Sequence, residues 1–204
     1  HCRDPEDAVR AAQSLGYPVV MKLAETDLIH KSRVGGVILG PADALEVRGA
    51  FGKLQDVARS RLQRKDCTVL VQEYVRDGVE TVLRARVDET FGPVLTLGLG
   101  GRFADFPSLR RDHVTPITDA EALRFVTGLP GVDKALAAGA RARRAYAAPL
   151  AEMTRRVSQM LTELTPIQEV TFDPFVVFPD SGRAVAVDAR IRVDEEDGEE
   201  DFGV

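Results

Sequence analysis

The chain has 204 residues, 44% of them hydrophobic, and a formal net charge of −5 at neutral pH. This length is enough for one sizeable hydrophobic core or for two lobes. Nucleic-acid binding is not expected, because phosphate contacts need clustered lysine and arginine and the basic runs here are short. No apolar run approaches the roughly 20 residues that cross a bilayer, so no membrane span is expected either.

The sequence contains two cysteines, Cys2 and Cys67. Two thiols are too few for a cysteine-only zinc site. The simplest interpretation is that both are reduced cysteines of a cytoplasmic protein. The chain does not open with a basic segment followed by an apolar one, as a signal peptide would. We therefore expect a cytoplasmic location.

The first part of the chain is predicted to contain two helices and three strands. An apolar stripe with spacings of three and four residues indicates the second, longer helix. The predicted elements, in chain order, are a helix over 5–14, a strand over 17–23, a strand over 34–39, a helix over 42–64 and a strand over 68–75.

The pattern changes after residues 77–78, where apolar and polar residues begin to alternate as in half-buried strands. Strands over 79–87 and 91–99 are predicted to form an antiparallel pair. Later elements are helices over 119–127 and 149–164 and strands over 167–178 and 184–193, whereas 128–148 resists assignment. This order predicts an α+β protein of two lobes, 1–73 and 74–193, with a ligand cleft between them and an acidic tail over 194–204.

Lys22 is the one charged residue in an otherwise apolar predicted strand. Because a buried lysine charge needs a partner, this position indicates either a bound anion such as phosphate or a side chain that reaches water at the end of the strand.

Two glycine-containing segments are candidates for loops that face phosphate. Gly35 and Gly36 follow His30-Lys31-Ser32, and Gly100 and Gly101 follow the predicted strand 91–99. Glycine lets backbone N–H groups approach a phosphate closely, although each pair is also compatible with an ordinary turn. The spacing is not that of a Walker A loop.

Acidic side chains in the last two predicted strands suggest a metal site. Glu169, Thr171 and Asp173 share one face of a strand, and Asp188 lies in the next strand. Oxygen ligands from adjacent strands suit Mg²⁺, a hard cation. The alternative is that Asp188 pairs with Arg190 or with another arginine of the sheet.

In this order, these segments resemble the ATP-grasp domain of ADP-forming acyl-CoA synthetases, which are related to the β-subunit of succinyl-CoA synthetase. The resemblance runs from about residue 5 to 193 and is carried by three stretches: 16–40, 71–101 and 168–193. It implies an ATP-grasp fold, ATP or ADP and Mg²⁺ as ligands, and a nucleotide cleft between the two lobes.

The resemblance also implies roles for individual residues. Lys22 and the two glycine loops, with Gly35, Gly36, Gly100 and Gly101, would hold the nucleotide phosphates. The segment from Gln72 through Glu73 to Val75 would hold adenine, and Glu80 the ribose. Asp173 and Asp188 would bind Mg²⁺, and His30 would help to relay a phosphoryl group from a phosphohistidine.

Several positions depart from the family pattern. Thr171-Phe172-Asp173-Pro174 replaces the usual Asp-Ile-Asn-Pro, so one acidic residue is lost and an amide ligand becomes a carboxylate. Arg33 stands where an aspartate is common, and His113 where an arginine is usual. Nucleotide binding is therefore better supported than turnover.

Three functions are compatible with the sequence. The first is the phosphotransfer domain of an acyl-CoA synthetase, inactive without partner domains or a partner subunit that bind CoA and carry the main phosphohistidine. The second is a degenerate nucleotide-sensing or structural domain, as in multidomain proteins of the protein-acetyltransferase type. The third is an ATP-dependent carboxylate ligase of another ATP-grasp branch, which the His30-Lys31-Ser32 segment disfavours.

Overall fold

The computed structural model describes residues 1–24, 34–64, 67–104, 106–132 and 140–194. The chain divides into two compact units, His1–Arg76 and Asp77–Val204. None of the described helices is both long enough and apolar enough to cross a membrane.

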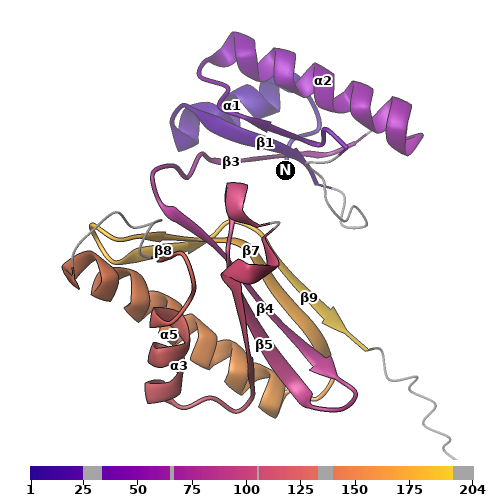
Figure 1. Ribbon diagram of the computed structural model, residues 1–204. Helices are drawn as coiled ribbons and strands as arrows, with labels where there is room; N and C mark the ends of the chain where they lie inside the picture. The colour runs from indigo at the N-terminus through magenta and orange to yellow at the C-terminus, as the bar shows by residue number, and fades with distance from the viewer. Residues whose placement is uncertain (25–33, 65–66, 105, 133–139, 195–204) are drawn as a thin grey trace, which may run out of the picture. The chain divides into compact units, whose positions relative to one another are not determined.

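The described part of the first unit is a three-stranded antiparallel sheet with two helices on one face (Figure 1). The sheet order is β2-β1-β3. Its elements are α1 (Pro5–Leu15), β1 (Val19–Leu23), β2 (Val37–Leu39), α2 (Ala44–Leu62) and β3 (Val69–Glu73). Both helices begin at an aspartate whose side chain accepts a backbone N–H of the first turn, Asp4 for α1 and Asp43 for α2.

Alternate residues of β1 and β3 form the core of the first unit with the helices. Val19, Met21 and Leu23 of β1 and Val69 of β3 are fully buried. The apolar stripe of α2 packs against them through Val47, Phe51, Leu54 and Ala58. Because strand side chains alternate, the intervening residues of β1 and β3 lie on the opposite face, which no described helix of this unit covers.

The second unit is a six-stranded antiparallel sheet in the order β6-β5-β4-β7-β8, with β9 also paired to β7. The strands are β4 (Val79–Asp88), β5 (Gly92–Leu99), β6 (Arg110–Val114), β7 (Ile167–Phe178), β8 (Arg183–Ala186) and β9 (Ala189–Val193). Its described helices are α3 (Asp119–Thr127) and α5 (Ala140–Glu163), with short 3-10 turns at Gly101–Phe103 and Pro107–Leu109.

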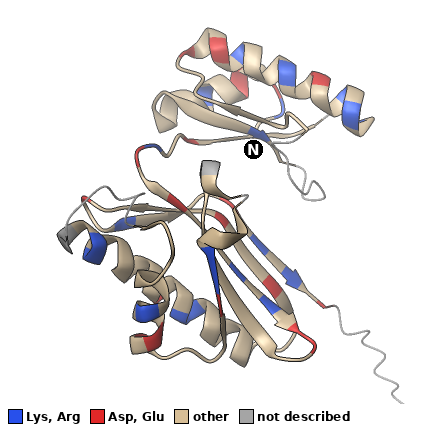
Figure 2. Ribbon diagram, in the orientation of Figure 1, with Lys and Arg blue, Asp and Glu red and all other residues tan. Residues whose placement is uncertain are grey.

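Helices α3 and α5 cover one face of this sheet (Figure 1). Their buried residues, including Phe125, Leu150 and Val157, pack on Leu83 and Leu95 of the sheet. The other face carries arginines and acidic residues, and basic positions recur along β9 (Figure 2). This unit therefore has a covered apolar face and an open charged face.

The structure corrects three details of the predicted elements. The strand predicted over 184–193 is two strands, β8 and β9. They are separated where the Val187 N–H donates to Pro174 O at 3.0 Å and the Asp173 N–H donates to Asp188 O at 3.1 Å. Helix α5 begins at Ala140 and continues through Pro149. Strand β6 was not predicted, because its sequence, RRDHV, is largely polar.

Candidate functional site

Lys22 lies on β1, the central strand of the first unit. Its Cα is paired with Val37 of β2 and with Leu70 of β3. Its chain neighbours Met21 and Leu23 are fully buried against the helices, whereas Lys22 is half-buried. The alternation of strand side chains therefore places Lys22 on the uncovered face of this sheet.

The first glycine loop lies beside Lys22. Gly36 is buried, and its carbonyl accepts the N–H of Leu23 at 2.9 Å. Gly35 has a φ of +77°, a left-handed conformation that favours glycine. Arg61 of α2 donates to the carbonyl of Val34 at 3.2 Å and ties the loop to the helix. His30 lies outside the described residues.

Gln72 of β3 is on the same face as Lys22. Its Cα is paired with Val20, two positions from Lys22 on β1. The Gln72 Oε1 is buried, and no described residue donates a hydrogen bond to it. A buried amide oxygen without a donor costs about 1–3 kcal/mol, so this atom is a natural acceptor for an N–H of a ligand. Glu73 is exposed at the end of β3, and Val75 follows half-buried.

Glu80 and the second glycine loop lie together in the second unit. Glu80 is exposed near the start of β4, and its carbonyl accepts the N–H of Gly100 at 2.8 Å. Gly101 has a φ of +56°, and a Cβ at this position would lie 2.7 Å from Glu80 Oε2. The Glu80 carboxylate therefore occupies the space beside Gly101 that the Cβ of any other residue would fill.

Asp173 and Asp188 lie on neighbouring strand segments. The Asp173 N–H donates to Asp188 O at 3.1 Å, so their backbones are directly linked. Asp188 is half-buried and Asp173 is exposed. The guanidinium of Arg190, two residues along the chain on β9, approaches Asp188 Oδ2 at 3.3 Å. The arginine partner considered as an alternative from the sequence is therefore present.

The donor set at Asp173 and Asp188 fits Mg²⁺. Among the described residues, no group of three or more His, Cys, Asp or Glu side chains is placed to hold a metal ion. Mg²⁺ is commonly held by one or two carboxylates while it keeps several waters and shares substrate phosphates. Two carboxylates on residues whose backbones are hydrogen-bonded are therefore chemically compatible with this ion, whereas they would not form a protein-only cage.

The open face of the second sheet carries a series of ion pairs that we did not predict. Arg84 of β4 and Arg192 of β9 approach the two carboxylate oxygens of Glu169, at 3.5 Å and 3.9 Å. Thr171 donates to Glu169 at 3.3 Å. Glu169 is thus held by arginines and a hydroxyl. The alternating arginines in VLRARV and ARIRV, spaced two apart, would have predicted a basic strip on one face.

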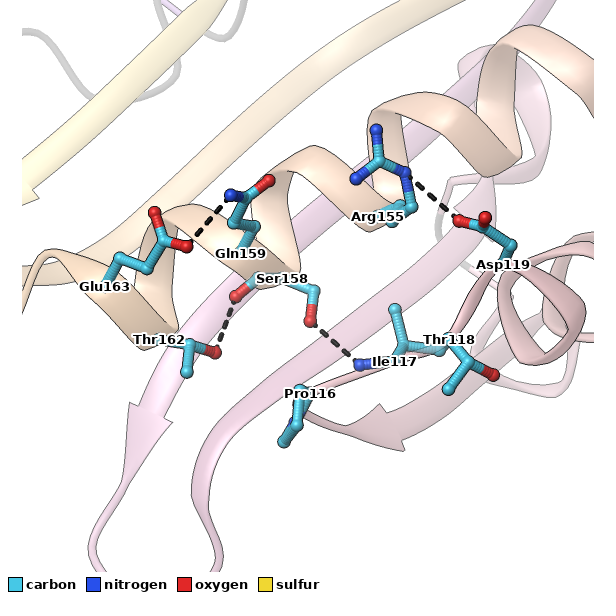
Figure 3. Close-up of a pocket in the computed structure, with 9 residues that line it drawn as sticks. All are labelled: Pro116, Ile117, Thr118, Asp119, Arg155, Ser158, Gln159, Thr162 and Glu163. Carbon is cyan, nitrogen blue, oxygen red and sulfur yellow. Dashed lines mark hydrogen bonds and ion pairs between the residues drawn. The ribbon is translucent and has the colours of Figure 1, made fainter.

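A separate hollow of about 470 Å³ lies in the second unit, between the start of α3 and the exposed side of α5 (Figure 3). In its lining, the Ile117 N–H donates to the Ser158 hydroxyl oxygen at 3.0 Å, and Arg155 forms an ion pair with Asp119 at 3.2 Å. None of the predicted site residues lines the hollow. Polar side chains of the lining already have hydrogen-bond or ion-pair partners within the protein. The hollow is a surface depression, and it lies apart from the predicted site residues.

A model of a known family, described as the ATP-grasp domain, matches residues 1–193. The chain therefore belongs to the ATP-grasp domain family, and within it to the type found in ADP-forming acyl-CoA synthetases. The mixed helices and sheets of the two units agree with this fold.

Two relatives illustrate the relationship. The chain is 33% identical to the β-subunit of acetate–CoA ligase [ADP-forming] I from Pyrococcus furiosus, over 93% of this chain and 81% of the relative. It is 30% identical to 4-hydroxybutyrate–CoA ligase [ADP-forming] from Nitrosopumilus maritimus, over 93% of this chain but only 27% of the relative. These relatives are acid–CoA ligases, and the chain spans about a quarter of the second.

Solved structures of a dinucleotide-forming acetyl-coenzyme A synthetase 1 from Ca. Korarchaeum cryptofilum are also similar. One, in complex with coenzyme A and Ca-AMPCP, has a TM-score of 0.80 at 26% identity, over 95% of this chain and 83% of that one. Another, with coenzyme A and Mg-AMPPCP, has its phosphohistidine segment pointing towards the nucleotide binding site. Its TM-score is 0.72 at 26% identity, over 95% of this chain and 84% of that one.

Proposed function

We propose that this chain binds ADP or ATP with Mg²⁺ and transfers a phosphoryl group between the nucleotide and a phosphohistidine, as the nucleotide-binding part of an ADP-forming acyl-CoA synthetase. The observation that carries this proposal is the grouping of the predicted residues within each unit. Lys22, Gly36 and Gln72 belong to adjoining positions of one sheet. Glu80 and Gly101 adjoin each other in the second unit.

Each group has a chemical task in this proposal. The Lys22 ammonium and the N–H groups of the Gly35–Gly36 and Gly100–Gly101 loops bind phosphate oxygens. The amide oxygen of Gln72 accepts a hydrogen bond from the base, in the segment that continues through Glu73 to Val75. The Glu80 carboxylate accepts hydrogen bonds from the ribose hydroxyls.

Phosphoryl transfer depends mainly on alignment and on neutralisation of charge. A terminal oxygen of ADP attacks the phosphorus, and the bond between phosphorus and the imidazole nitrogen breaks with its electron pair on that nitrogen. The ring keeps the proton on its other nitrogen, so ATP and neutral histidine result. Lys22 and the backbone donors stabilise the charge on the moving phosphoryl group. His30 is proposed to help in relaying it.

Asp173 and Asp188 are the residues that would hold Mg²⁺. The ion supplies positive charge to the phosphate oxygens when it is bound. The two carboxylates would be its protein ligands, and the backbone hydrogen bond of 3.1 Å from the Asp173 N–H to Asp188 O keeps the two residues adjacent.

We further propose that turnover needs a partner domain or subunit that binds CoA and carries the main phosphohistidine. This rests on the relatives, which include a β-subunit and a much longer single chain. The identity of the acid would be set by that partner.

A second candidate, a nucleotide-sensing domain without turnover, is favoured by one observation. Thr171 stands where the family has a carboxylate, and it hydrogen-bonds to Glu169, which two arginines already approach. In this case nucleotide binds but no phosphoryl group is transferred.

Calorimetric titration with ADP and with ATP, with and without Mg²⁺, tests binding. We expect Mg²⁺-dependent binding that is weakened at least about tenfold in Lys22→Met, the loss of one charged hydrogen bond. Lys53→Met is the matched control, because Lys53 is an exposed lysine on α2 outside the predicted site. A well-folded chain that binds neither nucleotide, or equal binding by the two variants, would contradict the proposal.

A further inference from the structure

Arg190 is placed to compete with a metal ion for Asp188. Its Nη2 lies 3.3 Å from Asp188 Oδ2, and its Cα is paired with Thr171 of β7. Both side chains are partly exposed, 43% for Arg190 and 39% for Asp188. The pair is therefore close enough to interact and open enough to rearrange.

A guanidinium and a divalent cation can both bind the same carboxylate oxygens. Arginine stays protonated at any physiological pH, so the competition is not relieved by deprotonation. An ion that binds Asp188 must either displace the Arg190 guanidinium or tolerate its charge nearby. Arg190 thus weakens the attraction of the carboxylate pair for a lone cation.

We propose that Arg190 is a displaceable counter-ion of Asp188, which makes Mg²⁺ bind together with nucleotide phosphate instead of alone. This inference rests on the proposed function of the Asp173–Asp188 pair. When the metal takes Asp188, the guanidinium is released beside the phosphate oxygens that accompany the metal. A guanidinium forms strong paired hydrogen bonds to phosphate, so its release contributes to nucleotide affinity.

Arg192 provides the internal comparison. It lies two residues further along β9, on the same face by strand alternation. It approaches Glu169 and Asp194, each at 3.9 Å, instead of Asp188. Its removal takes away the same charge from the same strand without freeing the proposed metal ligand.

The test is a titration of Mn²⁺, a stand-in for Mg²⁺, followed by the electron paramagnetic resonance signal of the free ion, with and without ADP. Arg190→Gln is expected to bind Mn²⁺ alone about two- to fivefold more tightly than the unaltered chain, the range of an exposed ion pair. In the same variant, the affinity for ADP in the presence of Mn²⁺ should fall about tenfold. Arg192→Gln should change neither affinity, and Asp188→Asn should weaken both.

Unchanged Mn²⁺ affinity in Arg190→Gln, or an equal change in Arg192→Gln, would overturn the role of Arg190 while leaving nucleotide binding standing. An unaltered chain that binds neither Mn²⁺ nor ADP would overturn the proposed site and this inference together. Far-ultraviolet circular dichroism of each variant establishes that the folded state is being compared.

Discussion

The contact between Gly101 and Glu80 gives a sharp test of the second glycine loop. Gly101→Ala adds a Cβ at a φ of +56° and places it 2.7 Å from Glu80 Oε2. The left-handed backbone costs a residue with a Cβ about 1–2 kcal/mol. The close contact is with the end of a flexible side chain, so the carboxylate moves away instead of breaking the fold.

The size of the binding effect follows from what Glu80 is proposed to do. Hydrogen bonds to a charged group contribute about 1.5–3 kcal/mol, so a displaced carboxylate should weaken ADP binding by about 10- to 100-fold. Glu80→Gln tests the same contact from the other side. Combined with Gly101→Ala, it should add little further loss, because both changes remove one interaction.

Gly92→Ala is the matched control. Gly92 has a φ of +70° at the turn between β4 and β5, and an added Cβ there would meet nothing within 4 Å. It should lower the free energy of unfolding by a similar 1–2 kcal/mol, measured by urea denaturation, without changing ADP affinity in calorimetry. If Gly101→Ala bound ADP as well as Gly92→Ala does, the assignment of Glu80 to the ribose would be wrong.

Three further predictions concern the scaffold of the second unit. Leu83 is fully buried, so Leu83→Ala should lower the free energy of unfolding in urea by about 2–5 kcal/mol. Gly128→Ala puts a Cβ 1.8 Å from Nη1 of Arg111, which donates hydrogen bonds to two carbonyls at the end of α3. The displaced guanidinium should lower the free energy of unfolding by about 1 kcal/mol per hydrogen bond lost, measured by thermal unfolding. Adding Arg111→Ala to this variant should cause little further loss. The Thr118 hydroxyl and N–H donate to Glu121 and lower the pKa of that carboxyl. Its stabilising effect is therefore present above the ordinary carboxyl pKa and lost as pH falls through the lowered one, so the melting temperatures of Glu121→Gln and the unaltered chain should converge on acidification.

Local signals predicted the elements whose ends are fixed by neighbouring residues. Helix α3 has the predicted bounds, Asp119 to Thr127, and the structure shows that Thr118 caps it through a reciprocal capping box with Glu121. Strand β7 was predicted from its apolar run and the turn that follows it. The pairing of β4 with β5 followed from two alternating segments joined by a short turn.

Long-range pairing was not accessible from local pattern. The break between β8 and β9 near Asp188 depends on how β7 pairs with these two successive strands. No local sequence signal near Asp188 predicts it. Strand β6 is held by its register with β5 and by contacts such as the hydrogen bond from Thr96 to Asp112, 2.5 Å long. The ion pairs of the arginine strip likewise join residues far apart in the chain.

The predicted site residues show the same division. Lys22 and the glycine loops could be singled out because a charged residue in an apolar strand and paired glycines are local anomalies. Arg190 appeared only as an alternative partner of Asp188, since its role depends on three-dimensional proximity. The adenine and ribose assignments came from family resemblance and stay predictions.

Phosphoryl transfer itself is tested most directly by a single-turnover experiment. The phosphohistidine-carrying segment of the same synthetase, labelled with ³²P, is mixed with this chain and Mg²⁺-ADP, and labelled ATP is separated and counted. We expect transfer of label to ATP by the unaltered chain and by Lys53→Met, and loss of transfer in Lys22→Met. Absence of labelled ATP, from a chain that binds Mg²⁺-ADP by calorimetry, would contradict catalysis and leave a nucleotide-sensing domain.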